Sequence, residues 1–103
     1  MKDTKLFLAQ TNPRLGNRKA NLDEHLAQID AARSRGAEWV LFPELSLTGY
    51  FLKDQTSELA LASDADELET LRMASSGLVL GFGIVERGLD ERFFNSYLLY
   101  EDG

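Results

Sequence analysis

Hydrophobic residues along the chain recur in short blocks, and polar segments with turn-forming residues separate these blocks. The first block, residues 5–10 (KLFLAQ), is a short apolar run followed by Asn12, Pro13 and Gly16. A run of this length bounded by turn signals is typical of a strand, and its lack of alternation indicates burial on both faces. We therefore expect a buried strand over residues 5–10.

The second block repeats with a helical period. Its apolar residues recur at steps of four, three and three, at Leu22, Leu26, Ile29 and Ala32. This spacing places them on one face of a helix. Asn17 is a suitable N-cap, and Gly36 follows a cationic last turn as a stop signal. The pattern predicts a helix that begins after Asn17 and ends near Gly36.

Residues 38–42 (EWVLF) predict a second strand. A strand, a helix and a strand joined by short links favour a right-handed crossover between parallel strands of one sheet. Residues 53–62 are expected to be helical, although their pattern is weak. A further helix is expected from Ser63, because Ser63 and Asp66 have the spacing of a capping box.

Two apolar segments near the end of the sequence predict a β-hairpin. Residues 77–86 (GLVLGFGIVE) and 92–101 (RFFNSYLLYE) are strand-like, and polar residues 87–91 lie between them. The predicted fold class is therefore α/β, with one mixed sheet and flanking helices. No internal repeat or linker divides the chain, so we expect one domain. Residues 101–103 (EDG) resemble a turn that joins two strands, which indicates a domain that continues past them.

The charge balance is acidic, with 17 Asp and Glu against 11 Lys and Arg and a formal net charge of -6. Such a chain has no general attraction for phosphate backbones or anionic lipid, so we expect neither a nucleic-acid partner nor a membrane partner. No uncharged run has the length of a membrane span or a signal segment, which makes the cytoplasm the expected location. The absence of cysteine excludes disulfides, thiolate metal sites and a thiol nucleophile within these residues.

An acidic residue follows the second predicted strand. Glu44 comes directly after Pro43, between residues that all look buried: Trp39, Val40, Leu41, Phe42, Leu45 and Leu47. Open α/β sheets place catalytic groups at the carboxyl ends of strands, and Pro43 restricts the direction in which the chain leaves the strand. Glu44 is therefore a candidate catalytic residue.

The environment of Glu44 decides what it can do. If apolar neighbours covered it, desolvation would raise the pKa of its carboxyl toward values that suit a general base. The residues expected to provide this cover are Leu45, Leu47, Tyr50 and Phe51. The alternative is a solvated glutamate in a turn, or one that accepts hydrogen bonds from backbone N–H groups.

Residues 41–50 (LFPELSLTGY) resemble the signature around the first catalytic glutamate of the nitrilase superfamily, the carbon–nitrogen hydrolases. Residues 7–44 are similar to the opening strand and helix of that family. Residues 82–87 (FGIVER) and 93–103 (FFNSYLLYEDG) are similar to the strand pair that follows. The resemblance covers nearly the whole chain in the family's order.

This resemblance implies an α-β-β-α sandwich, of which residues 1–103 are the amino-terminal portion of a single carbon–nitrogen hydrolase domain. It also implies covalent catalysis by a Cys, a Glu and a Lys, commonly assisted by a second Glu. Only the first Glu has a counterpart here, Glu44, because the family's Lys, Cys and second Glu fall beyond Gly103. We therefore expect this polypeptide alone to be inactive, with no cofactor and no metal implied.

Other residues near the signature are weaker candidates. Tyr50 is a weak candidate for substrate binding, since Tyr50 and Phe51 either line the substrate entrance or pack beside the strand end. Lys53 lies upstream of the family's Lys position and is expected at the surface. The acidic residues between positions 64 and 69 lack the spacing of a calcium loop and suit the start of a helix.

Structural roles are expected for the remaining polar residues of note. Asn95 and Ser96 are expected to be structural, and Glu86 is expected to support the fold. His25, the only histidine, is expected to be structural or solvated. Ser46 has no histidine obviously within reach and no G-x-S-x-G elbow, which argues against a serine hydrolase.

Three functions remain open. The first is a nitrilase-type hydrolase that cleaves a non-peptide amide, nitrile or carbamoyl C–N bond in a small molecule, with assembly into a homo-oligomer. The second is the glutaminase portion of a glutamine-dependent NAD synthetase. The third is a non-catalytic truncated module that binds a partner through unpaired sheet edges. The coding sequence after Gly103 would discriminate among them.

Overall fold

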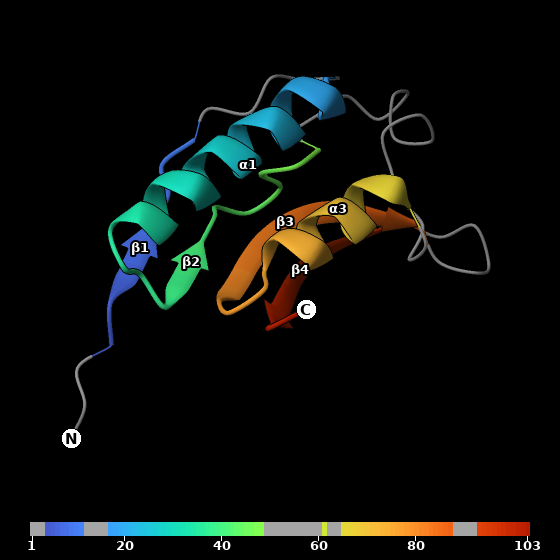
Figure 1. The fold of residues 1–103 in the computed structure, drawn as a ribbon. Helices are drawn as coiled ribbons and strands as arrows, with labels where there is room; N and C mark the ends of the chain where they lie inside the picture. Colours follow the sequence, from blue (N-terminus) through green and yellow to red (C-terminus); the bar gives the residue numbers. More distant parts are fainter. Residues whose placement is uncertain (1–3, 12–16, 49–60, 62–64, 88–92) are drawn as a thin grey trace.

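A computed structural model describes residues 4–11, 17–48, 61, 65–87 and 93–103 of the chain. Along the chain these residues form β1 (Leu6–Leu8), α1 (Arg18–Ser34), β2 (Trp39–Leu41), α3 (Asp66–Ala74), β3 (Val79–Arg87) and β4 (Phe93–Glu101). Apart from the helix expected over residues 53–62, the order of strands and helices is the one that the hydrophobic pattern predicts. Figure 1 shows the arrangement, with both helices on the same side of the sheet.

The strands form one mixed sheet in the order β1-β2-β3-β4. β1 pairs with β2 in parallel, with Phe7 opposite Val40, and β2 pairs with β3 in parallel, with Val40 opposite Leu80. β3 and β4 are antiparallel, with Phe82 opposite Leu98. The predicted α/β class, the parallel crossover and the terminal hairpin are thus confirmed.

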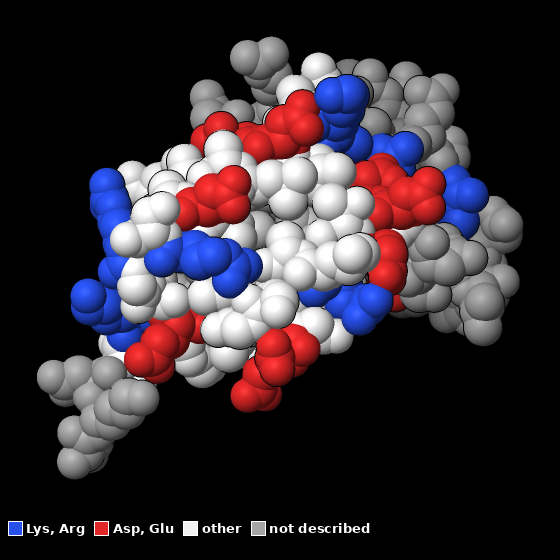
Figure 2. Space-filling model, in the orientation of Figure 1, with Lys and Arg blue, Asp and Glu red and all other residues white. Residues whose placement is uncertain are grey.

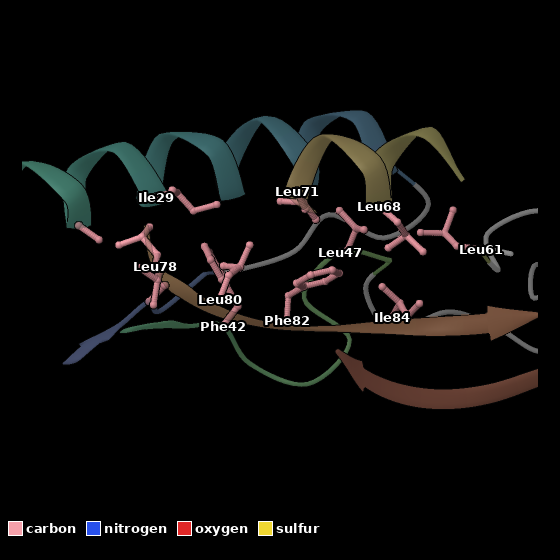
Figure 3. Close-up of a cluster of buried hydrophobic side chains, with 13 residues drawn as sticks. Ile29, Phe42, Leu47, Leu61, Leu68, Leu71, Leu78, Leu80, Phe82 and Ile84 are labelled. Carbon is pink, nitrogen blue, oxygen red and sulfur yellow. The ribbon is translucent and has the colours of Figure 1, made fainter. Parts of the chain in front are cut away.

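The hydrophobic core lies between the sheet and the two helices. Figure 3 shows Leu80, Phe82 and Ile84 of β3 pointing toward Ile29 of α1 and Leu71 of α3. The alternation of β3 explains this, because every second side chain of a strand points to the same face. The sheet therefore has one face that α1 and α3 cover.

The opposite face of the sheet, here called the open face, is uncovered at apolar side chains of β1, β2 and β4, whereas Val85 of β3 on the same face is buried. The exposed fractions are 51% for Leu6, 65% for Leu8, 38% for Trp39, 47% for Tyr97 and 56% for Leu99. The prediction that the first strand is buried on both faces is therefore wrong, and so is the expected burial of Trp39. A continuous apolar run indicates that both faces are apolar, but it does not show whether a second layer covers each of them.

α1 begins after Asn17, whose side chain accepts a hydrogen bond from the backbone N–H of Ala20 at 3.0 Å, as predicted. Its buried residues are Asn21, His25, Ile29 and Ala32. The predicted apolar face is thus half right: Leu22 and Leu26 are only partly buried at the margin of the core. The polar residues Asn21 and His25 are instead buried on this face of the helix.

α3 begins at Asp66, and its N-cap is Ala65. An alanine side chain has no hydrogen-bonding group, so the predicted capping box of Ser63 and Asp66 does not start this helix. Three acidic residues in the first turn, Asp66, Glu67 and Glu69, lie near the positive end of the helix dipole instead. At its other end, Arg33 of α1 donates to the carbonyl oxygens of Ala74 and Ser76 at 2.6 and 2.8 Å.

The helix predicted over residues 53–62 lies outside the described residues, except for Leu61. Leu61 forms an isolated parallel bridge with Glu86 of β3. Among the described residues, no helix is long and apolar enough to cross a membrane. On the face that Figure 2 shows, acidic and basic side chains are interspersed, so no basic stripe runs across it.

Candidate active site

The chain leaves β2 under tight restraint from the neighbouring strands. The backbone N–H of Phe42 donates to the carbonyl oxygen of Gly81 in β3 at 2.8 Å. The Tyr97 hydroxyl of β4 donates to the carbonyl oxygen of Phe42 at 2.7 Å. Phe42 is therefore held from two sides just before Pro43, and a turn of residues 44–48 follows at once.

The beginning of this turn lies directly against Gly83 in the middle of β3. A β-carbon on Gly83 would overlap the backbone nitrogen of Leu45 and come within 2.8 Å of the carbonyl carbon of Glu44. Phe82 and Ile84 point toward the helices, so the hydrogen of Gly83 that is replaced faces the open side of the sheet. The Glu44–Leu45 peptide therefore lies on the open face, at the carboxyl end of β2.

The rest of the turn completes the hydrogen bonds of β3 beyond the end of β2. The N–H of Gly83 donates to Ser46 Oγ at 3.2 Å, and the carbonyl oxygen of Gly83 accepts from the N–H of Leu47 at 3.0 Å. The N–H of Val85 donates to Thr48 Oγ1 at 3.3 Å, and the carbonyl oxygen of Val85 accepts from Leu61 at 2.9 Å. Buried backbone groups need such partners, which explains the hydroxyl residues at positions 46 and 48.

Ser46 also contacts the single histidine. His25 Nε2 lies 2.8 Å from Ser46 Oγ, and both side chains are buried, each with 1% of its surface exposed. The expectation that no histidine reaches Ser46 is therefore wrong. The reason is tertiary: α1 crosses the turn, and residues 21 positions apart come into contact.

The His25–Ser46 pair does not form a nucleophilic site. His25 Nδ1 lies 2.6 Å from the carbonyl oxygen of Asn21, rather than beside a carboxylate, and Ser46 Oγ is already bonded to Gly83. The His25 ring stacks on Phe42 with 4.1 Å between centroids and 22° between planes. Burial lowers the pKa of His25, while its contact with Asn21 and the charge of Glu24 oppose this effect. The histidine is thus structural and buried, which is the first of the two alternatives expected for it, and it is not solvated.

Glu44 itself is exposed among the described residues. The expected apolar cover is absent there: Leu45 is half-buried, and Leu47 lies in the core between sheet and helices (Figure 3). Leu47 points away because residues 46 to 48 return to the edge of β3. Tyr50 and Phe51, the other expected cover, lie outside the described residues, as does Lys53.

The remaining predicted residues have structural partners or lie outside the description. Ser96 donates to Glu86 Oε1 at 2.8 Å, which supports the structural roles expected for both. The side chain of Asn95 lies outside the described part. Within the residues that the structure covers, no group of three or more His, Asp or Glu could hold a metal ion.

Comparison with known proteins identifies the family. The family model for carbon-nitrogen hydrolase matches residues 5–103. The chain belongs to the carbon–nitrogen hydrolases. A solved structure of a CN-hydrolase superfamily protein from Xanthomonas campestris has the same fold, with a TM-score of 0.86, 19% identity and coverage of 99% of this chain and 38% of that chain.

Two curated relatives are similar to this carbon–nitrogen hydrolase chain in sequence. A glutamine-dependent NAD(+) synthetase of Acinetobacter baylyi is 29% identical over 103 residues, which are 100% of this chain and 19% of the relative. A bromoxynil-specific nitrilase of Klebsiella pneumoniae subsp. ozaenae is 29% identical over 114 residues, with coverage of 96% and 33%. The chain therefore spans about a fifth to a third of the length of these relatives.

Several residues around Glu44 have roles that the sequence did not reveal. Asn21 and His25 look like polar positions beside an apolar face, yet they share a stripe with Ile29 and Ala32 at steps of four, four and three. That spacing is itself helical and was the available signal. No local pattern marks Tyr97 or Gly83, because their contacts with the turn join distant parts of the chain.

Proposed function

We propose that this chain provides Glu44 as the general base of a nitrilase-type carbon–nitrogen hydrolase that cleaves a non-peptide amide, nitrile or carbamoyl C–N bond. One observation carries the proposal. Glu44 begins a turn at the carboxyl end of a parallel strand, and this turn is held in place by hydrogen bonds to β3 and by close contact with Gly83. A general base has to be held within reach of the proton that it removes. The restraint on residues 42 to 48 provides this position.

The proposed chemistry requires groups that these residues lack. The thiol of a cysteine loses its proton to Glu44 and attacks the C–N carbon, and Glu44 gives that proton to the nitrogen. From an amide or carbamoyl compound the protonated nitrogen departs and leaves an acyl-enzyme, whereas a nitrile gives an imidate enzyme. Glu44 then takes a proton from a water molecule that hydrolyses the covalent intermediate. A lysine ammonium stabilises the developing oxyanion. The 103 residues contain no cysteine, so the isolated chain does not carry out this reaction.

The open sheet face supports Glu44 as part of a larger site. Glu44 is exposed among the described residues, and its backbone lies on the same face of the sheet as Tyr97 and Leu99. A second layer over this face would exclude water and enclose the carboxyl group in a site. We accordingly propose that residues 1–103 are the amino-terminal portion of one domain whose other layer completes the site, and that Tyr50 contributes weakly to substrate binding.

A second candidate is the glutaminase portion of a glutamine-dependent NAD synthetase. The Acinetobacter baylyi relative favours it, because the match covers 100% of this chain and lies within 19% of that relative. The reaction would be the same in kind, with the side-chain amide of glutamine as substrate. The non-catalytic module remains the contrasting proposal, and it is supported by the exposed apolar side chains of the open face.

The assembly and location proposed for the complete protein rest on general properties. We propose a homo-oligomer for the complete protein on its membership of the carbon–nitrogen hydrolases alone, because the proposed second layer would cover apolar side chains of the open face such as Leu8 and Leu99. No uncharged run of these residues has the length of a membrane span or a signal segment, and we propose the cytoplasm.

Release of ammonia by the longest expressible polypeptide that contains these residues tests the function. The substrates are glutamine, a small aliphatic amide, a carbamoyl compound and a nitrile that is followed to its acid. Activity on one of them that Glu44→Gln abolishes supports the proposal, and the substrate distinguishes the two candidates. Glu38→Gln is the matched control, because Glu38 is an exposed glutamate at the opposite end of β2. Full activity of Glu44→Gln would remove Glu44 from the mechanism.

A further inference from the structure

We propose that His25 and Ser46 are positioning residues that hold the Glu44 turn in the geometry that proton transfer requires. This inference rests on the proposed role of Glu44. Ser46 lies two residues after Glu44, and its side chain joins the turn to both β3 and α1. Neither residue touches the reacting atoms, so each would act only through the position of Glu44.

The hydrogen bonds of this pair have a defined direction. The carbonyl oxygen of Asn21 can only accept, so His25 Nδ1, 2.6 Å away, carries the proton. In the neutral imidazole Nε2 is then an acceptor, and it receives the hydroxyl proton of Ser46 at 2.8 Å. The lone pairs of Ser46 Oγ are left to accept the N–H of Gly83 at 3.2 Å. Each donor thus has one acceptor, and Ser46 has a single orientation.

Further contacts fix the two ends of this chain of hydrogen bonds. Asn21 Nδ2 donates to the carbonyl oxygen of Leu47 at 3.0 Å, on the other side of Ser46. The His25 ring stacks on Phe42 and meets the edge of Phe82, with centroids 4.1 and 6.3 Å away. α1 therefore contacts the chain both before and after Glu44. These contacts join the turn to both α1 and β3.

The turn needs such support because its backbone is not in a relaxed conformation. Leu45 has a φ of 53°, in the left-handed region that residues other than Gly and Asn rarely adopt. Strain of this kind persists only where the surroundings enforce it. Ser46 is the next residue, and its hydroxyl contacts both α1 and β3. Loss of its bonds would let Leu45 relax and displace the Glu44 carboxylate.

A purely structural role is the competing explanation, and chemistry at the buried position distinguishes the two. The neighbouring stripe positions of α1 hold Ile29 and Ala32, so a hydrocarbon side chain at position 25 could also fill space. A buried imidazole and hydroxyl are costly unless both are bonded. A buried imidazole and hydroxyl at these positions fit a requirement for a defined orientation of the turn, because hydrogen bonds are more directional than apolar contacts.

The test compares Ser46→Ala, His25→Leu and His25→Gln in the longest expressible polypeptide, with Ile29→Val as a core control on the same helix. All are assayed at a temperature at which thermal unfolding shows each variant to be folded. Ser46→Ala and His25→Leu should lower kcat by about 10- to 100-fold with KM nearly unchanged. His25→Gln should recover part of the loss, since its side-chain oxygen can accept from Ser46, and Ile29→Val should leave kcat unchanged.

The outcomes separate this inference from the proposed function. If Glu44→Gln is inactive but Ser46→Ala and His25→Leu retain the kcat of the wild type, the positioning role is wrong and the function stands. If Glu44→Gln is fully active, the function fails and a role in proton transfer fails with it, and nitrogen-15 NMR of the chain decides whether His25 and Ser46 hold the turn. The inference predicts the Nδ1-protonated tautomer of His25 and shifted amide resonances of Glu44 and Leu45 in Ser46→Ala. The Nε2-protonated tautomer with unshifted resonances would overturn it.

Discussion

A β-carbon on Gly83 would lie 2.8 Å from the carbonyl carbon of Glu44, so β3 and the turn after β2 are in contact without any intervening side chain. This contact joins two segments 39 positions apart and places Glu44 on the open face of the sheet. Only glycine fits, because the obstructing atoms belong to the backbone and cannot rotate away. The position of the proposed general base therefore depends on a residue that carries no functional group.

Gly83→Ala should displace the turn and destabilise the fold. Overpacking of this kind costs about 1–3 kcal/mol in the free energy of unfolding, which urea denaturation measures. Gly81→Ala is the comparison variant and should lose less stability, because a β-carbon there meets only side-chain atoms of Leu41 and Tyr97, which can move at the cost of the Tyr97–Phe42 hydrogen bond. Equal loss of stability in the two variants, or an active Gly83→Ala enzyme, would contradict the contact.

Stability should depend on the protonation of His25. Burial lowers the pKa of folded His25 below its value of about 6.5 in the unfolded chain, so the unfolded state binds more protons between the two values. The contribution is complete above pH 6.5 and is lost as the pH falls through the folded pKa. The free energy of unfolding should decrease by up to about 1.4 kcal/mol per pH unit in this range.

His25→Gln supplies the control for this pH dependence. The variant should lose the slope that sets in as the pH falls below about 6.5. Urea denaturation at half-unit intervals of pH measures the effect. A wild-type slope that persists in His25→Gln would assign it to other groups.

The isolated 103-residue chain should self-associate through its open face. Leu8 and Leu99 are 65% and 56% exposed there, beside the partly exposed Trp39 and Tyr97. Multi-angle light scattering should show species larger than the monomer, and the double variant Leu8→Lys/Leu99→Lys should reduce them. Met73→Lys is the control, because Met73 is 67% exposed but belongs to α3. A monodisperse wild-type monomer would count against this face as an association surface.

The fold was largely accessible from the sequence, because periodicity reports which residues share a face. The period of α1, its Asn17 cap and the terminal hairpin were predicted and are present. The start of α3 was not, because Ala65 rather than Ser63 precedes it. Burial of the first strand was also predicted wrongly, since Leu6 and Leu8 are apolar whether or not a layer covers them.

The candidate site was accessible only in part. The position of Glu44 after a strand and Pro43 indicated a candidate catalytic residue, and the structure places it at the carboxyl end of β2. Its partners could not be predicted, because His25, Ser46 and Gly83 meet through tertiary packing. The resemblance of residues 41–50 to the family signature supplied what local patterns could not.

The most direct test of the account is kcat/KM for Glu44→Gln, measured against the wild type and Glu38→Gln in the longest expressible polypeptide. Gln has nearly the same size and shape as Glu, so the substitution should leave the free energy of unfolding nearly unchanged. Loss of a general base should lower kcat/KM on the accepted substrate by about 100-fold or more, with Glu38→Gln unaffected. Equal activity of the wild type and both variants would contradict the assignment of Glu44.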